Sequence, residues 1–171
     1  MAKAKTAPFW LTAQVDLTAN DTYTQTTIPL GSYIDVASKQ AVAIISVDYF
    51  VQNTATNSRK IGSDSFVDFQ LTDINRNALV VGDDTALISS GALAYDNTPP
   101  SFTNANDLYP DSFGTLNEAR MVVNDDIFFG AQSDSAGGTN PQTAIVRIQA
   151  QVVKLTEKDF MALALTSVAS A

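Results

Sequence analysis

Carboxylates are the side chains in this sequence that could carry out acid–base chemistry. The 171 residues include no histidine and no cysteine, which removes the usual general base, thiolate nucleophiles and thiolate metal sites. Adjacent aspartates occur at Asp83-Asp84 and at Asp125-Asp126, and two facing carboxyl groups would suit a glycosidase. Aspartate is also common in turns, where it bonds to nearby backbone amides. We therefore expect both pairs in turns and predict that the protein is not an enzyme.

Oxygen-rich loops are the second candidate for chemistry, because calcium is bound by several carboxylate and carbonyl oxygens. Residues 73–77 (DINRN) resemble the start of a calcium loop, but Ala78 stands where that loop needs glycine and Asp84 where it needs glutamate. We predict no cofactor and no small-molecule substrate. The alternative is a looser calcium site at a subunit boundary, formed by Asp107, Asp111 or Asp134.

The charge balance indicates protein partners. Only ten side chains are basic, they are scattered along the chain, and the net charge is −8, so we expect no direct nucleic-acid binding. Charged residues make up 16% of the chain, against about 25–35% of the surface of a typical small domain. A chain that exposes few charges is expected to cover much of its surface with partners.

The start of the chain favours a protein that is made and kept in the cytosol, or assembled there into something later released. Residues 1–17 lack the apolar core of a signal peptide. No stretch of the sequence approaches the ~18 apolar residues of a membrane span.

Period-two alternation predicts strands at residues 11–18, 41–51, 66–72 and 144–155. The run AVAIISVDYFV at 41–51 is the strongest and has apolar residues on both faces, so we expect a central strand. Further strands are predicted at 22–28, 118–123 and 127–132, with a hairpin joining 79–81 to 85–88 and an irregular segment at 96–114. Short strands separated by turns predict a sandwich or barrel.

The end of the chain changes to a helical period. Thr156 followed by Asp159 resembles a capping box, so we predict a C-terminal helix over 156–169. Its apolar stripe of Phe160, Met161, Leu165 and Val168 should pack on something. We predict one domain over 1–171, with 1–8 as an N-terminal arm.

Aromatic residues near the start of the chain and in the strand at 127–132 are candidates for subunit contacts. Trp10 either closes the domain's own core, the simpler interpretation, or anchors in a neighbour as a hot-spot residue. The adjacent rings of Phe128 and Phe129 should point to opposite faces of a strand. The residues expected at subunit contacts are Phe9, Trp10, Phe129, Phe160, Met161 and Leu165.

Two stretches, 120–130 (RMVVNDDIFFG) and 144–154 (AIVRIQAQVVK) with the terminal helix, resemble the single jelly-roll major capsid proteins of tailless icosahedral viruses of archaea and bacteria. The resemblance implies an all-β, jelly-roll-like antiparallel β-sandwich. It also implies a coat subunit that assembles with copies of itself and other virion proteins into the virion shell. Because only Lys3 and Lys5 could form a basic arm, it favours a shell built over an internal membrane or over another protein.

Three other functions stay open at this point. A phage tail-tube or decoration protein would also self-assemble. A carbohydrate-binding or adhesin module would use loop aromatics such as Tyr95, Phe102, Tyr109 and Phe113 as a sugar platform. An enzyme that uses carboxylates alone ranks last.

Overall fold

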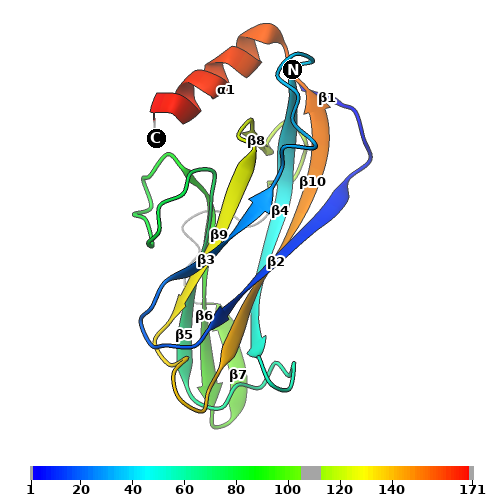
Figure 1. The fold of residues 1–171 in the computed structure, drawn as a ribbon. Coiled ribbons are helices and arrows are strands. Elements are labelled where there is room, and N and C mark those ends of the chain that lie inside the picture. Colours follow the sequence, from blue (N-terminus) through cyan, green and yellow to red (C-terminus); the bar gives the residue numbers. More distant parts are fainter. Residues whose placement is uncertain (1, 105–112, 170–171) are drawn as a thin grey trace.

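Two antiparallel sheets form the molecule, as shown by the computed structural model, which describes residues 2–104 and 113–169 (Figure 1). Sheet A contains β1 (Lys3–Ala4), β2 (Phe9–Leu17), β4 (Gln40–Asn53), β8 (Arg120–Val122) and β10 (Gln142–Lys154). Sheet B contains β3 (Thr24–Pro29), β5 (Ser65–Thr72), β6 (Leu87–Asn97), β7 (Pro100–Asn104) and β9 (Asp126–Ser133). The helix α1 (Glu157–Ala169) follows β10 directly.

The strand pairing is that of a jelly roll. In sheet A, β2 pairs with β10, and β10 pairs with β4, which pairs with β8. In sheet B, β3 pairs with β9, and β9 pairs with β5, which pairs with β6. The first of these eight strands therefore lies beside the last, the second beside the seventh, and so on inward, as in a long hairpin that has been rolled up. The predicted antiparallel sandwich with a short C-terminal helix is confirmed.

The main core lies between the inner faces of the two sheets. Alternate residues of β10 supply it from the middle of sheet A, as its period-two pattern predicts: Val146 and Ile148 are fully buried. Three stacked aromatic rings fill the centre of this core. Tyr49 stacks on Phe69 at 5.2 Å and on Phe129 at 6.1 Å between ring centroids, which joins the two sheets across the core.

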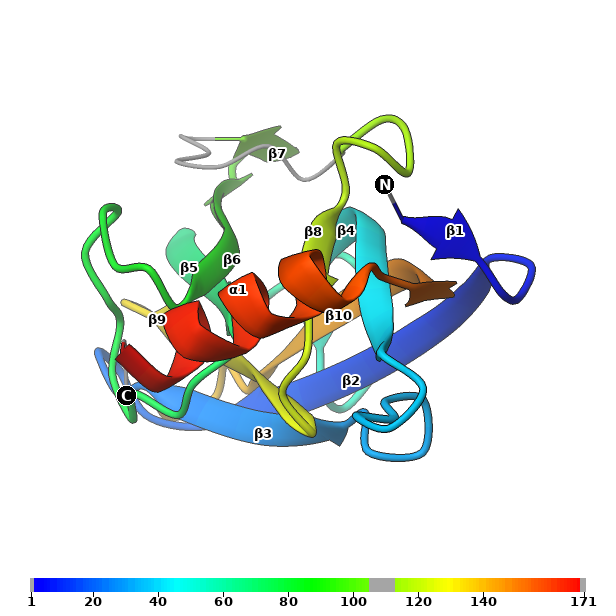
Figure 2. The ribbon, with the colours of Figure 1, turned by 90° about the horizontal axis from the view of Figure 1, so that it is seen from above.

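A second, smaller core lies on the other face of sheet A, under α1. Its buried members come from β4, β10 and the start of the helix: Ala41, Ala43, Val153, Leu155 and Phe160. Ala41 and Ala43 reach this face because Ile45 is an extra residue in β4, where the pairing with β10 shifts between Gln149 and Ala150. Val153 and Leu155 reach it by the ordinary alternation of β10. Seen from above, α1 crosses this end of the molecule, with β1 on one side and the 73–86 loop on the other (Figure 2).

Two predicted segments differ from the structure. Residues 79–81 and 85–88 do not form a hairpin, because 73–86 is a loop and the strand β6 runs on from Leu87 to Asn97. Its residues Ser89, Ser90, Gly91 and Ala92 are small and carry no β-branched side chain, which hides the strand from a propensity argument. The segment 96–114, expected to be irregular, contains β7.

The predicted N-terminal arm is attached to its own domain. Lys3 pairs with Lys154 and Ala4 with Val153 across β1 and β10. The amide of Lys5 donates to the Val152 carbonyl at 2.8 Å. Residues 3–5 therefore extend the edge of sheet A that β2 begins.

Candidate assembly surfaces

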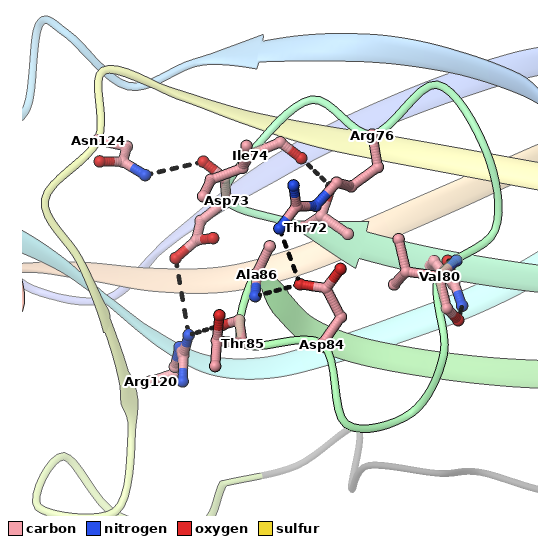
Figure 3. A network of polar contacts seen from close by, with 11 residues as sticks. Thr72, Asp73, Ile74, Arg76, Val80, Asp84, Thr85, Ala86, Arg120 and Asn124 are labelled. Atoms are coloured by element: carbon pink, nitrogen blue, oxygen red, sulfur yellow. Dashed lines mark hydrogen bonds and ion pairs between the residues drawn. The ribbon is translucent and has the colours of Figure 1, made fainter. Parts of the chain in front are cut away.

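Two arginines and two aspartates come together where the 73–86 loop meets β8 (Figure 3). Arg76 donates to Asp84 at 3.1 Å, and Arg120 lies 3.6 Å from Asp73. Arg120 also donates to the Thr85 carbonyl at 2.9 Å, and Asn124 donates to the Asp73 carbonyl at 2.8 Å. The cluster fastens the loop to the end of sheet A.

The electrostatics of this cluster are those of a structural network. Burial raises the pKa of Asp73, and the positive charges of Arg120 and Arg76 oppose that rise only in part. A hydrogen bond from the Ala86 amide, with help from Arg76, lowers the pKa of Asp84. Each carboxylate faces an arginine, which keeps its proton at any physiological pH, so the arrangement provides no pair of carboxyl groups that exchange a proton.

Three of the four paired aspartates lie in loops or bends, as predicted, and the fourth begins a strand. Asp83 and Asp84 lie in the 73–86 loop, Asp125 lies in the bend before β9, and Asp126 is the first residue of that strand. The Asp125 carbonyl accepts a hydrogen bond from the Leu30 amide at 2.6 Å.

The segment that resembles a calcium loop uses its oxygens within the protein. Asp73 faces Arg120, and the side chains of Asn75 and Asn77 both accept hydrogen bonds from Gln25, at 2.7 and 3.1 Å. Within residues 2–104 and 113–169 no three acidic side chains converge as a metal site would require. Asp134 instead accepts the Phe66 amide at 2.8 Å. Asp107 and Asp111 lie outside the described residues.

The six residues predicted at subunit contacts divide into two groups. Phe129 is fully buried between the sheets, and Phe160 is 5% exposed under α1. Both predictions need correction, because each ring fills a core of its own chain and leaves no surface for a neighbour. The prediction that Phe128 and Phe129 point to opposite faces holds, since Phe128 is only partly buried.

The N-terminal aromatic residues are at the surface or near it. Trp10 is 49% exposed on the outer face of sheet A, where the guanidinium of Arg147 lies 4.9 Å from its ring centre. The exposure contradicts the simpler interpretation that Trp10 closes the core. Phe9, on the other face of the strand, is half-buried and stacks on Tyr33 at 4.9 Å.

The outer side of α1 exposes large apolar side chains. Phe160 and Leu163 face the sheet, whereas Met161 is 54% exposed and Leu165 is 66% exposed. The predicted apolar stripe is therefore split between two faces of the helix. The capping interaction is present, because the Asp159 amide donates to the Thr156 hydroxyl at 3.2 Å.

A groove of about 530 Å³ runs beside the helix. Its apolar lining comes from the N-terminal segment, the loop before β8, β8 itself, the end of β10 and α1: Ala2, Leu116, Met121, Leu155 and Leu163. Asp159 also lines it, and a hydrogen bond with Thr156 lowers the pKa of this carboxyl group. The groove and the exposed side chains of Met161 and Leu165 are together called the α1 surface.

Several exposed groups were not expected from the sequence. Val36 and Val81 are each 70% exposed, and Phe66 is 39% exposed. Lys3, Lys5, Lys39 and Lys154, which are far apart in the sequence, come together where β1, β10 and β4 meet. Alternation predicts which face of a strand a residue takes, but it does not predict which strands are neighbours. None of the helices in the described part of the chain is long and apolar enough to span a membrane.

Comparison with known proteins yields matches only among solved structures. No family model and no curated protein sequence matches the chain. A chain of the Desmodium yellow mottle tymovirus is 7% identical, with 91% of this chain and 93% of that one covered and a TM-score of 0.34. VP1 of the Trichodysplasia spinulosa-associated polyomavirus, solved with sialylated glycooligomers, is 10% identical, with coverages of 89% and 98% and a TM-score of 0.40.

A chain of turnip yellow mosaic virus is 8% identical, with coverages of 87% and 95% and a TM-score of 0.31. Scores at this level describe a loose likeness. The assignment to the jelly-roll fold rests on the strand pairing itself.

Proposed function

We propose that this protein is a coat subunit that assembles with copies of itself, and with other virion proteins, into a viral shell. The observation that carries the proposal is the α1 surface. α1 packs Phe160 and Leu163 against its own sheet and exposes Met161 and Leu165 on its other side, and exposed apolar patches are typical of interaction sites. The outer side is covered when another chain packs against it.

Fold and composition support the same function. Jelly rolls serve in viral capsids, in lectins and in cupins, so the fold alone does not choose among them. The sequence lacks histidine and cysteine, and the carboxylates of the charged cluster face arginines. These features favour a structural role over an enzymatic one.

The carbohydrate-binding alternative loses its proposed platform. Tyr95 is only 4% exposed and packs against Phe102 at 4.8 Å. Phe102 is in turn covered by Arg59, whose guanidinium lies 5.3 Å from the ring centre. Phe113 packs against the main core, and Tyr109 lies outside the described residues.

The proposal is tested by examining the purified chain at high concentration. We expect shells or rings in electron micrographs and oligomers in sedimentation. Stable oligomers of this kind have contacts that each bury more than about 1,000 Å². Helical tubes would favour the tail-tube alternative. A strictly monomeric protein at all concentrations would contradict self-assembly.

A pair of substitutions tests the α1 surface. M161K with L165K places two charges on the outer side of the helix, and we expect it to prevent assembly while the fold, followed by circular dichroism, is retained. V81K is the matched control, because Val81 is an apolar side chain that is at least as exposed but lies in the 73–86 loop. An equal loss of assembly in the control would show that α1 has no special role.

A further inference from the structure

Four lysines form one positively charged region where β1, β10 and β4 meet. Lys3 lies directly across from Lys154, and Lys154 lies across from Gln40 on its other side. Lys5 donates to the Gln40 side chain at 2.8 Å, and the Lys39 carbonyl accepts from the Leu155 amide at 3.0 Å. We call Lys3, Lys5, Lys39 and Lys154 the lysine corner. It gathers four of the ten basic residues of the chain.

Most of the charge of the lysine corner is not neutralised within the chain. Lys39 forms an ion pair with Glu157 at 3.0 Å. For Lys3, Lys5 and Lys154, no carboxylate lies within ion-pair distance in the part of the chain that the structure describes. Like charges directly opposite each other on neighbouring strands destabilise a sheet. A partner that brings negative charge to this corner would remove that cost.

The opposite end of the same molecule is acidic. Asp64 accepts the Asn97 amide at 2.8 Å, which places it next to Asp96, and Asp134 accepts the Phe66 amide at 2.8 Å. All three carboxylates are exposed, and they surround the start of β5. We call Asp64, Asp96 and Asp134 the aspartate end. The charge of Asp134 also raises the pKa of Asp68, second to the effect of burial, which shows how closely negative charges gather there.

The lysine corner and the aspartate end lie at opposite ends of the sandwich. β4 and β10 run the full length of sheet A, from Gln40 and Lys154 at the corner to Asn53 and Gln142 at the other end (Figure 1). Figure 1 shows β1 beside α1, whereas the start of β5 and the end of β6 lie at the far end. The two ends therefore carry clusters of opposite sign, although Asp35 and Glu157 also lie at the lysine corner and Arg59 beside the aspartate end.

We propose that the lysine corner of one copy docks on the aspartate end of the next copy. The inference rests on the proposed self-assembly and specifies which surfaces meet. Charge complementarity identifies the occupant: each copy carries at its far end three exposed carboxylates, for the three lysines that form no ion pair within the described residues. The two surfaces differ, so the contact is heterologous, and its repetition closes a ring or continues as a helix.

Charge reversal on each side tests the contact. The corner variant K3E/K5E/K154E and the end variant D64K/D96K/D134K should each fail to assemble, because like charges then face each other. An equimolar mixture of the two should assemble again, because each variant offers the charge that the other needs. R147E, compared with K3E alone, is the matched control: it reverses one exposed basic side chain in the middle of β10, away from both surfaces, and should leave assembly unchanged.

A milder variant covers the case in which the end variant fails to fold, as judged by circular dichroism. D64N/D96N/D134N keeps an oxygen acceptor for each backbone amide and removes only the charge. We expect the threshold concentration for assembly to rise about tenfold, because three exposed charge contacts are lost together.

The outcomes separate this inference from the proposed function. A wild-type chain that stays monomeric would contradict the proposed function itself. Assembly of the wild type together with normal assembly of the corner variant would overturn only the docking of corner on end. If wild-type assembly needs added RNA or anionic vesicles, and the end variant assembles normally with them, then the lysine corner binds that polyanion and this inference is wrong.

Discussion

At the scale of single residues, one close approach controls the packing of the edge strand β3. The ring of Tyr23 lies over Gly130 of β9, where a Cβ atom would collide with the phenol. Burial raises the pKa of Tyr23, in agreement with this packing. Only a glycine leaves room for the ring there.

We expect G130A to lower the free energy of unfolding by about 1–3 kcal/mol, because the new methyl group overpacks the site. Urea denaturation measures the change. G31A is the control, since a Cβ at Gly31 would meet no atom closer than 3.9 Å. If the two variants lose equal stability, the contact with Tyr23 is not the cause.

The carboxyl group of Asp68 reports on the aspartate end. Its pKa is raised by burial and by the negative charge of Asp134, so the folded state holds this proton more tightly than the unfolded chain. The contribution of Asp68 to stability is therefore fully present below its unfolded pKa and is lost as the pH rises through the folded pKa.

The variant D134N removes the negative charge and keeps a side-chain oxygen that can accept the hydrogen bond from the Phe66 amide. We expect the pKa of Asp68 to fall toward its ordinary value, because one of its two causes has gone. Titration of the side-chain carboxyl carbon by NMR measures the pKa. An unchanged pKa would mean that the two carboxylates do not interact.

At the scale of elements, α1 is held by few side chains. Phe160 is its buried anchor, within the small cluster that Ala41, Ala43, Val153 and Leu155 form on sheet A. Thr156 caps the first turn through the Asp159 amide, a contact worth about 1 kcal/mol.

We expect F160A to lower the free energy of unfolding by about 3–5 kcal/mol, because it empties the site of a buried ring. M161A, one position along the same helix, should cost far less in the monomer, since Met161 is 54% exposed. Denaturant unfolding of both variants tests the assignment of inner and outer sides. A larger loss for M161A would reverse it.

At the scale of the whole molecule, the two proposed contacts respond differently to salt. The Debye length falls from about 10 Å at 0.1 M to about 3 Å at 1 M ionic strength. The contact between the lysine corner and the aspartate end should weaken over that range, while apolar burial at the α1 surface should not.

The threshold concentration for wild-type assembly should therefore rise with salt. Light scattering against protein concentration, at several ionic strengths, measures it. The mixture of D64N/D96N/D134N with K3Q/K5Q/K154Q lacks these charges and should show little salt dependence. A wild type that assembles equally well at all ionic strengths would argue against the electrostatic contact.

Much of this fold could be predicted from alternation, because one side of each long strand faces the core. Val146 and Ile148 on β10 follow that rule. The side of β4 on which Ile44 lies could not be predicted. The pairing of β4 with β10 shifts beside Ala150, and this shift turns the side chain of Ile44 toward the main core, where it is fully buried. A bulge depends on the partner strand and leaves no period of its own.

The candidate surfaces were predictable only in part, for a similar reason. Met161 and Leu165 are on the surface as expected for contact residues, whereas Phe129 and Phe160 are buried in their own chain. Apolar character predicts that a side chain is covered but not by which chain it is covered. The lysine corner depends on the pairing of β1 with β10, which joins the two ends of the sequence.

That pairing of first strand with last also determines when the chain can fold. β2 ends at Leu17 and pairs with Gln142 at the start of β10, so sheet A cannot close before nearly all of the chain has been synthesised. Contacts between residues this far apart in sequence slow folding to milliseconds or longer. The hairpin of β5 and β6 is local enough to form first. The lysine corner needs β1 on β10, so it forms only after Lys154 has been synthesised and later than the local hairpin of β5 and β6.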